Sequence, residues 1–128
     1  MDGLENNAVI LSEGANISDI GPRLNKLLSN GWQLTPDKKG VTKCFYFPTY
    51  TKVMDFAFCI GIRSKRANHH STLTMKSGSV EVTWTTHVPP GLSMKDTKMA
   101  DYCDDVAKTT VISVHQTESL KCGTPSKA

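Results

Sequence analysis

The side chains best suited to chemistry lie close together in this sequence. Asn68 is followed by His69 and His70, His87 comes seventeen positions after His70, and Asp96 comes nine positions later. Histidine can donate and accept a proton near neutral pH, so two imidazoles can act as the general acid and the general base of one reaction. A lone His-His pair is commonly only the polar end of a strand. The later histidine and aspartate favour a proton-transfer site instead.

Helices and strands must hold these residues in place. The first such structure that the sequence predicts is a β-hairpin. Residues 71–76 and 79–87 are rich in β-forming residues and flank a tight turn that contains Gly78. Side chains alternate between the two faces of a strand. His87 is therefore expected on the more polar face, and Thr86 on the face that also carries Trp84.

A helix is predicted to begin at Ser93, after residues 89–91 break the second strand. Asp96 lies three residues further on, close to the spacing of a capping box. Capping is thus an alternative role for Asp96, and it is compatible with a role in the site. The buried stripe of this helix is predicted to comprise Met99, Cys103, Val106 and Ala107.

The first half of the chain predicts two helices and two strands. An apolar stripe at helical spacing comprises Ile17, Ile20, Leu24, Leu27 and Leu28. Asn16 or Ser18 could cap this helix, Gly31 could end it, and Pro22 is expected only within its first turn. Strands are predicted at 32–35 and 41–47, and a second helix at 49–67. The resulting order, α-β-β-α-β-β-α, predicts an α+β fold: a four-stranded antiparallel sheet with helices packed on one face.

The second helix carries two apolar stripes. One stripe comprises Val53, Phe56, Ala57 and Ile60, and the other comprises Met54, Phe58 and Ile62. A helix that packs on one sheet needs only one stripe. The second stripe therefore predicts contact with another copy of the same helix, and a more enveloped core is the alternative.

Composition sets the class of protein. The 128 residues predict one domain over 15–114, with a poorly ordered segment at 1–14 and a disordered tail at 115–128. A net charge of +3 does not favour direct nucleic-acid binding. Neither a secretory signal nor an apolar run of about 18 residues is seen, so no membrane segment is expected. The scattered cysteines, Cys44, Cys59, Cys103 and Cys122, predict reduced thiols in an intracellular protein and no zinc site.

From about Asn16 to Lys108 the chain resembles the pterin-4a-carbinolamine dehydratases. The resemblance rests on Gly31-Trp32, on Phe45-x-Phe47, on Asn68-His69-His70, on Thr86-His87, and on Gly91-Leu92-Ser93 leading to Asp96. Six positions differ from residues common in the family, and two of them, Leu73 and Ser77, replace aromatic residues that could pack against a pterin ring. The other four are Lys65, Ser71, Pro89 and Pro90.

The resemblance implies an enzyme that removes water from 4a-hydroxytetrahydropterin to give quinonoid dihydropterin during tetrahydrobiopterin recycling. It implies no metal and no bound cofactor. His69 and His87 are then the acid and the base, in an order left open, and Asp96 orients or stabilises an imidazole. Substrate binding falls to His70, with Asn68, Thr86 and Trp32, although Trp32 could equally be a core residue. The resemblance also implies a homotetramer built through helix 49–67, and a cytoplasmic location.

Two other functions are alternatives. The family also includes non-catalytic dimerisation cofactors of a homeodomain transcription factor, which use the same helix surface and would act in the nucleus. A metal-dependent hydrolase built on His69, His70, His87 and Asp96 is the other. Adjacent histidines on an extended chain point to opposite faces, which makes shared coordination of one ion awkward.

Overall fold

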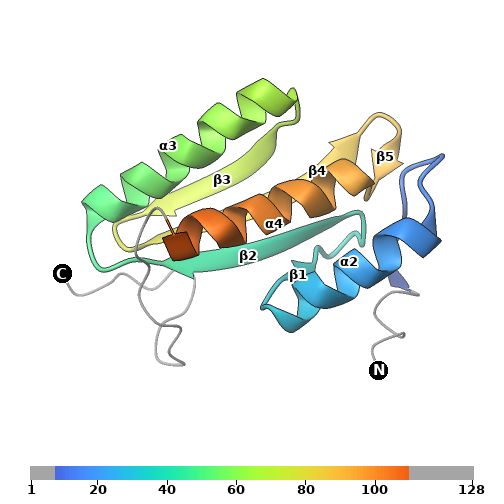
Figure 1. The fold of residues 1–128 in the computed structure, drawn as a ribbon, viewed down its shortest axis with the longest axis horizontal. Helices are drawn as coiled ribbons and strands as arrows, with labels where there is room; N and C mark the ends of the chain where they lie inside the picture. Colours follow the sequence, from blue (N-terminus) through green and yellow to red (C-terminus); the bar gives the residue numbers. More distant parts are fainter. Residues whose placement is uncertain (1–7, 110–128) are drawn as a thin grey trace. The chain divides into compact units, whose positions relative to one another are not determined.

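The structure, a computed structural model, describes residues 8–109. It contains three described helices and an antiparallel sheet, which confirms the predicted α+β class (Figure 1). The sheet has the strand order β1-β2-β4-β3, and a fifth, two-residue strand, β5, pairs with β4. The prediction of four strands therefore missed β5. Two compact units make up the described chain, residues 8–43 with 83–101 and residues 44–82 with 102–109.

The first unit begins with α2 (Ile17–Ser29), which Asn16 caps by accepting a hydrogen bond from the Ser18 amide. Pro22 lies inside α2, so its expected place in the first turn is wrong. Pro22 is exposed on the surface of the helix. In a helix the N–H group of residue 22 would bond to the carbonyl of residue 18, and proline has no such N–H group. Because Pro22 is exposed, water can hydrogen-bond the Ser18 carbonyl instead.

Strand β1 (Gln33–Leu34) pairs with the start of β2 (Gly40–Tyr46) in antiparallel register, Leu34 opposite Val41. The last residues of β4 (Ser79–His87) and β5 (Pro90–Gly91) form a second antiparallel pair. Helix α4 (Met94–Thr109) begins directly after this pair. The core of the unit consists of Ile20, Leu24, Leu27, Trp32, Val41, Trp84, Leu92, Met99 and Ala100.

A short parallel bridge joins Leu11 to Leu92 in the same unit. The Ser12 amide donates to the Leu92 carbonyl at 2.8 Å, and the Leu92 amide donates to the Ile10 carbonyl at 2.9 Å. Sequence reasoning missed this pairing, which lies within the segment predicted to be poorly ordered. Residues 1–7 and the predicted tail at 115–128 lie outside the described part of the chain.

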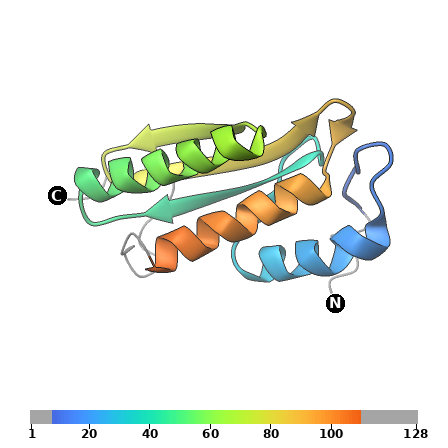
Figure 2. The same cartoon turned by 45° about the horizontal axis from the view of Figure 1, so that its top comes forward.

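The second unit contains α3 (Tyr50–Ala67), which lies along β3 (Ser71–Lys76) (Figure 2). Thr49 caps α3 by accepting a hydrogen bond from the Lys52 amide. Phe56 packs against Phe45 and Phe47, with ring centroids 4.8 and 5.0 Å away. The predicted inward stripe is buried, and it comprises Val53, Phe56, Ala57 and Ile60.

The cysteine prediction is wrong at one position. Cys44 is disulfide-bonded, whereas Cys59 and Cys103 are free. The reason is that sequence spacing does not restrict which thiols approach each other in space. Cys122 lies outside the described residues.

Candidate functional site

The predicted site residues belong to both units, and each group is described within its own unit. Thr86, His87 and Asp96 lie in the first unit, as does Trp32. Asn68, His69 and His70 lie in the second. The grouping of His69 and His70 with His87 and Asp96 therefore stays a prediction.

Thr86 and Asp96 are brought together in the first unit, at the end of β4 and in the first turn of α4. The Thr86 hydroxyl donates to Asp96 Oδ2 at 2.8 Å, and the Ser93 amide donates to the same oxygen at 2.9 Å. Asp96 is fully buried. The bond from the Ser93 amide shows that Asp96 caps α4, and the bond from Thr86 ties the same carboxylate to the residue before His87.

His87 has the position that strand alternation predicts. Val80, Val82 and Trp84 are buried on one face of β4, and His87 is exposed at its end on the other. In the β4–β5 pair His87 stands opposite Pro90, and Thr86 stands opposite Gly91. Solvent and small molecules can therefore reach the imidazole of His87.

Asn68 and His69 end α3 in the second unit. Asn68 is the C-cap residue and adopts a left-handed conformation, φ 55° and ψ 43°, which asparagine tolerates better than most residues. The His69 amide then donates to the Ser64 carbonyl at 3.0 Å. His69 is only 9% exposed, whereas His70 at the next position is exposed. The two neighbouring imidazoles thus differ in access to solvent.

Trp32 is 1% exposed. The Nζ atom of Lys43 lies 6.0 Å from the centroid of its ring, within reach of a cation–π interaction. This burial favours the core role that was the alternative for Trp32. Its role in substrate binding stays a prediction.

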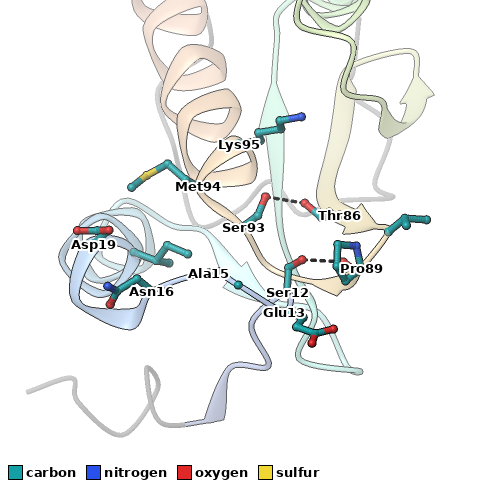
Figure 3. Close-up of a pocket in the computed structure, with 13 residues that line it drawn as sticks. Ser12, Glu13, Ala15, Asn16, Asp19, Thr86, Pro89, Ser93, Met94 and Lys95 are labelled. Carbon is teal, nitrogen blue, oxygen red and sulfur yellow. Dashed lines mark hydrogen bonds between the residues drawn. The ribbon is translucent and has the colours of Figure 1, made fainter.

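An open pocket of about 410 Å³ adjoins the Thr86–Asp96 pair in the first unit (Figure 3). Thr86 and Ser93 line it, and their hydroxyl oxygens lie 2.6 Å apart. Ser12 lines it too and donates to the Pro89 carbonyl at 2.7 Å. Sequence reasoning treated Ser93 as a helix start and as part of the family pattern, without a role of its own in the site, and it gave no signal for Ser12.

Comparison with known proteins identifies the family. The family model described as pterin 4 alpha carbinolamine dehydratase matches residues 16–106. The chain belongs to this family. The matched segment contains the three histidines and the aspartate singled out above.

Relatives and a solved structure agree with this membership. A Ruegeria pomeroyi protein that carries the family's name is 31% identical over 96 residues, which are 75% of this chain and 99% of that protein. The pterin-4-alpha-carbinolamine dehydratase of Drosophila melanogaster is 27% identical over 92 residues, 72% of this chain and 48% of the fly protein. The crystal structure of a transcriptional coactivator/pterin dehydratase from Brucella melitensis matches with a TM-score of 0.65. Its sequence identity is 25%, over 72% of this chain and 96% of that one.

None of the helices within residues 8–109 is both long and apolar enough to cross a membrane. No group of three or more histidine, cysteine, aspartate or glutamate side chains within residues 8–109 is arranged to hold a metal ion.

Proposed function

We propose that this protein removes water from 4a-hydroxytetrahydropterin to give quinonoid dihydropterin. The observation that carries the proposal is the family match over residues 16–106, which includes the complete set of His69, His70, His87 and Asp96. The reaction belongs to tetrahydropterin recycling, a cytoplasmic process.

The proposed reaction needs one acid and one base. Protonation of the 4a-hydroxyl lets the C4a–O bond break with release of water, and positive charge develops on the ring. Loss of the N5 proton then forms the C4a=N5 double bond. His69 and His87 divide these two transfers, in an order left open.

His70 is proposed to hold the pterin, and its exposed side chain supports a contact with a bound molecule. Asn68 and Thr86 are proposed to assist it. Asp96 is proposed to orient an imidazole. Its hydrogen bond from Thr86, at 2.8 Å, supports such a role because it fixes the strand end that carries His87.

A spectrophotometric assay of 4a-hydroxytetrahydropterin dehydration tests the proposal. The wild-type protein should accelerate the formation of quinonoid dihydropterin in proportion to its concentration. A strong chelator should leave the rate unchanged, because no metal takes part in the proposed mechanism. An uncatalysed rate at every protein concentration would reject the dehydratase function.

The second candidate function is an interaction role, and the surface of α3 favours it. Met54, Phe58 and Ile62, here named the outer stripe, are 42%, 70% and 47% exposed. Grouped apolar side chains of this size commonly mark an interface. We propose that the outer stripe joins copies of this chain into a homo-oligomer, and the family resemblance supplies the number four.

The same stripe could instead hold a different protein, as a dimerisation cofactor of a transcription factor would. The Brucella melitensis protein is described as a coactivator as well as a dehydratase, which supports keeping this alternative. A pull-down from nuclear extract distinguishes the two. Capture of a transcription factor by the wild type, and not by a Phe58→Glu variant, would favour the partner role.

A further inference from the structure

The turn that follows His87 receives little support from its own hairpin. Residues 88–89 form this turn between β4 and β5, and Val88 is 86% exposed. In the β4–β5 pair His87 stands opposite Pro90. Pro89 and Pro90 both lack an N–H group, so neither can donate a hydrogen bond that would close the hairpin at His87. The turn therefore depends more than usual on hydrogen bonds from another part of the chain.

Residues 10–12, here named the strap, supply such bonds from the same unit. The Ile10 amide donates to the carbonyl of Lys38, in the turn between β1 and β2, at 2.8 Å. The Leu92 amide donates to the Ile10 carbonyl at 2.9 Å, and the Ser12 amide donates to the Leu92 carbonyl at 2.8 Å. The strap is thus bonded through its backbone to the β1–β2 turn and to the residue that follows β5.

The Ser12 hydroxyl joins the strap to the turn. It donates to the Pro89 carbonyl at 2.7 Å (Figure 3). Ser12 is only 5% exposed, so water competes little for this bond. A Cβ at Gly91 would lie 2.4 Å from the Ser12 nitrogen, so β5 lies directly against the strap. Removing the hydroxyl would leave the Pro89 carbonyl without this donor, whereas the backbone bonds of the strap do not depend on the side chain.

His87 therefore lies between two anchored residues. Before it in the chain, Thr86 donates to the buried carboxylate of Asp96 at 2.8 Å. After it, Pro89 accepts from Ser12 at 2.7 Å. The imidazole of His87 is exposed, so its location depends more on the backbone on both sides than on packing. Location matters because a catalytic group displaced by about 1 Å can lose on the order of 10² in rate.

We propose that Ser12 is a positioning residue for His87, an inference that rests on the proposed dehydration. The hydroxyl of Ser12 fixes the turn at 88–89, and the turn fixes the imidazole of His87 where it exchanges a proton with the pterin. The family match begins at residue 16, so the strap lies outside it. Positioning of His87 by the strap is therefore a feature of this chain's own sequence and does not follow from family membership.

The first test compares Ser12→Ala with the wild type in the dehydration assay, at a temperature where far-UV circular dichroism shows both folded. Ser12→Ala should lower kcat about tenfold, less than the full cost of a 1 Å displacement because Thr86 still anchors the other side. KM should change less than about twofold, since His87 is proposed to act in the transition state. Ser12→Thr keeps the hydroxyl and should restore most of kcat. A folded Ser12→Thr protein as slow as Ser12→Ala would overturn the inference.

Thr85→Val is the matched control. The Thr85 hydroxyl donates to the Lys39 carbonyl at 2.6 Å, so valine also removes a bond from a hydroxyl to a turn carbonyl. This bond reaches the β1–β2 turn and not the turn at 88–89, so Thr85→Val should keep the kcat of the wild type. Equal losses of kcat in Thr85→Val and Ser12→Ala would indicate general destabilisation and overturn the inference.

Nuclear magnetic resonance of the histidine side chains supplies a readout that needs no turnover. In protein labelled with 13C-histidine, the His87 signal is assigned by its loss in His87→Ala. At constant pH this signal should shift or broaden in Ser12→Ala and stay unchanged in Thr85→Val. An unchanged signal in Ser12→Ala, or a wild-type kcat in that variant, would overturn the inference. If the wild type dehydrates no pterin, the proposed function fails, and the resonance comparison alone decides whether Ser12 positions His87.

Discussion

Asp96 illustrates how one residue can serve both fold and site. Its buried carboxylate accepts from the Ser93 amide, one residue before α4, and from the Thr86 hydroxyl, one residue before the end of β4. A buried carboxylate needs such partners, because an unpaired charge away from water is strongly destabilising. The same two bonds hold the residue before His87 in place. The capping interpretation and the positioning interpretation are thus compatible.

The first prediction concerns His87. His87→Ala should reduce kcat by on the order of 10² or more, the usual scale for removing a general acid or base. The far-UV circular dichroism should be unchanged, because the side chain is exposed at the end of β4. His115→Ala, at the remaining histidine of the chain, serves as the control and should keep full activity. A folded His87→Ala protein with wild-type turnover would remove His87 from the mechanism.

The second prediction is that replacing His70 affects the kinetic constants differently from replacing His87. His70→Ala should raise KM more than it lowers kcat, because the proposed contact is made equally in the ground state and the transition state. Steady-state kinetics over a range of pterin concentrations measure both constants. Lower kcat at unchanged KM would contradict the assignment and exchange the proposed roles of His69 and His70.

Sequence reasoning found these residues because their types and spacing are informative without a structure. It could not find Ser12, since a lone serine before a helix has no periodicity and its partner, Pro89, is 77 positions away. It also could not show that the Ser93 hydroxyl lies 2.6 Å from the Thr86 hydroxyl, because this contact depends on how β4 and the start of α4 meet. Spacing therefore identified candidate proton carriers, and only the structure identified the hydroxyl groups beside Thr86.

At the scale of secondary-structure elements, the long helices and strands were predicted well. Helix α3 was expected over 49–67 and spans Tyr50–Ala67, because its apolar spacing, Thr49 and Asn68 all specify its limits locally. Strand β5 and the Leu11–Leu92 bridge were missed. A two-residue strand has no periodic pattern, and its existence depends on long-range hydrogen bonds.

The prediction at the scale of secondary-structure elements concerns Gly91 in β5. Its φ is +134°, and an added Cβ would lie 2.4 Å from the Ser12 nitrogen and 2.5 Å from the Leu11 carbonyl carbon. Gly91→Ala should therefore destabilise the fold beyond the roughly 1–2 kcal/mol of an unfavourable backbone conformation. Urea denaturation followed by circular dichroism measures the difference in free energy of unfolding.

Gly14→Ala is the matched control for Gly91→Ala. Gly14 also has a positive φ, +94°, but an added Cβ there meets no atom within 4 Å. It should show only the conformational part of the cost, about 1–2 kcal/mol. Equal destabilisation by the two substitutions would mean that residues 11 and 12 can move away from an added Cβ at little cost. The bridge to these residues would then not stabilise β5.

At the scale of the whole molecule, the outer stripe is the feature that a single copy of the chain does not explain. Two stripes on one helix predicted one buried face and one exposed face, and the burial of Val53, Phe56 and Ile60 against the exposure of Phe58 confirms that division. What covers the exposed face was not determined by periodicity, because the same side chains would suit another copy or another protein. A self-association measurement decides between them.

The last prediction is that the protein is a homo-oligomer that Phe58→Glu dissociates. Burying an exposed apolar side chain contributes roughly 1.5–3 kcal/mol, and symmetry repeats this contribution in every copy. A carboxylate at the centre of the stripe would lose that contribution and add like-charge repulsion between copies. The fold of each copy should survive, because Phe58 is 70% exposed and the inward stripe is unchanged. Sedimentation velocity should show an oligomeric wild type and a monomeric variant, whereas Ser18→Glu, with the same charge at an exposed position of α2, should remain oligomeric. A wild type that sediments as a monomer at micromolar concentration would defeat the proposed self-association and leave a different protein as the partner of this face.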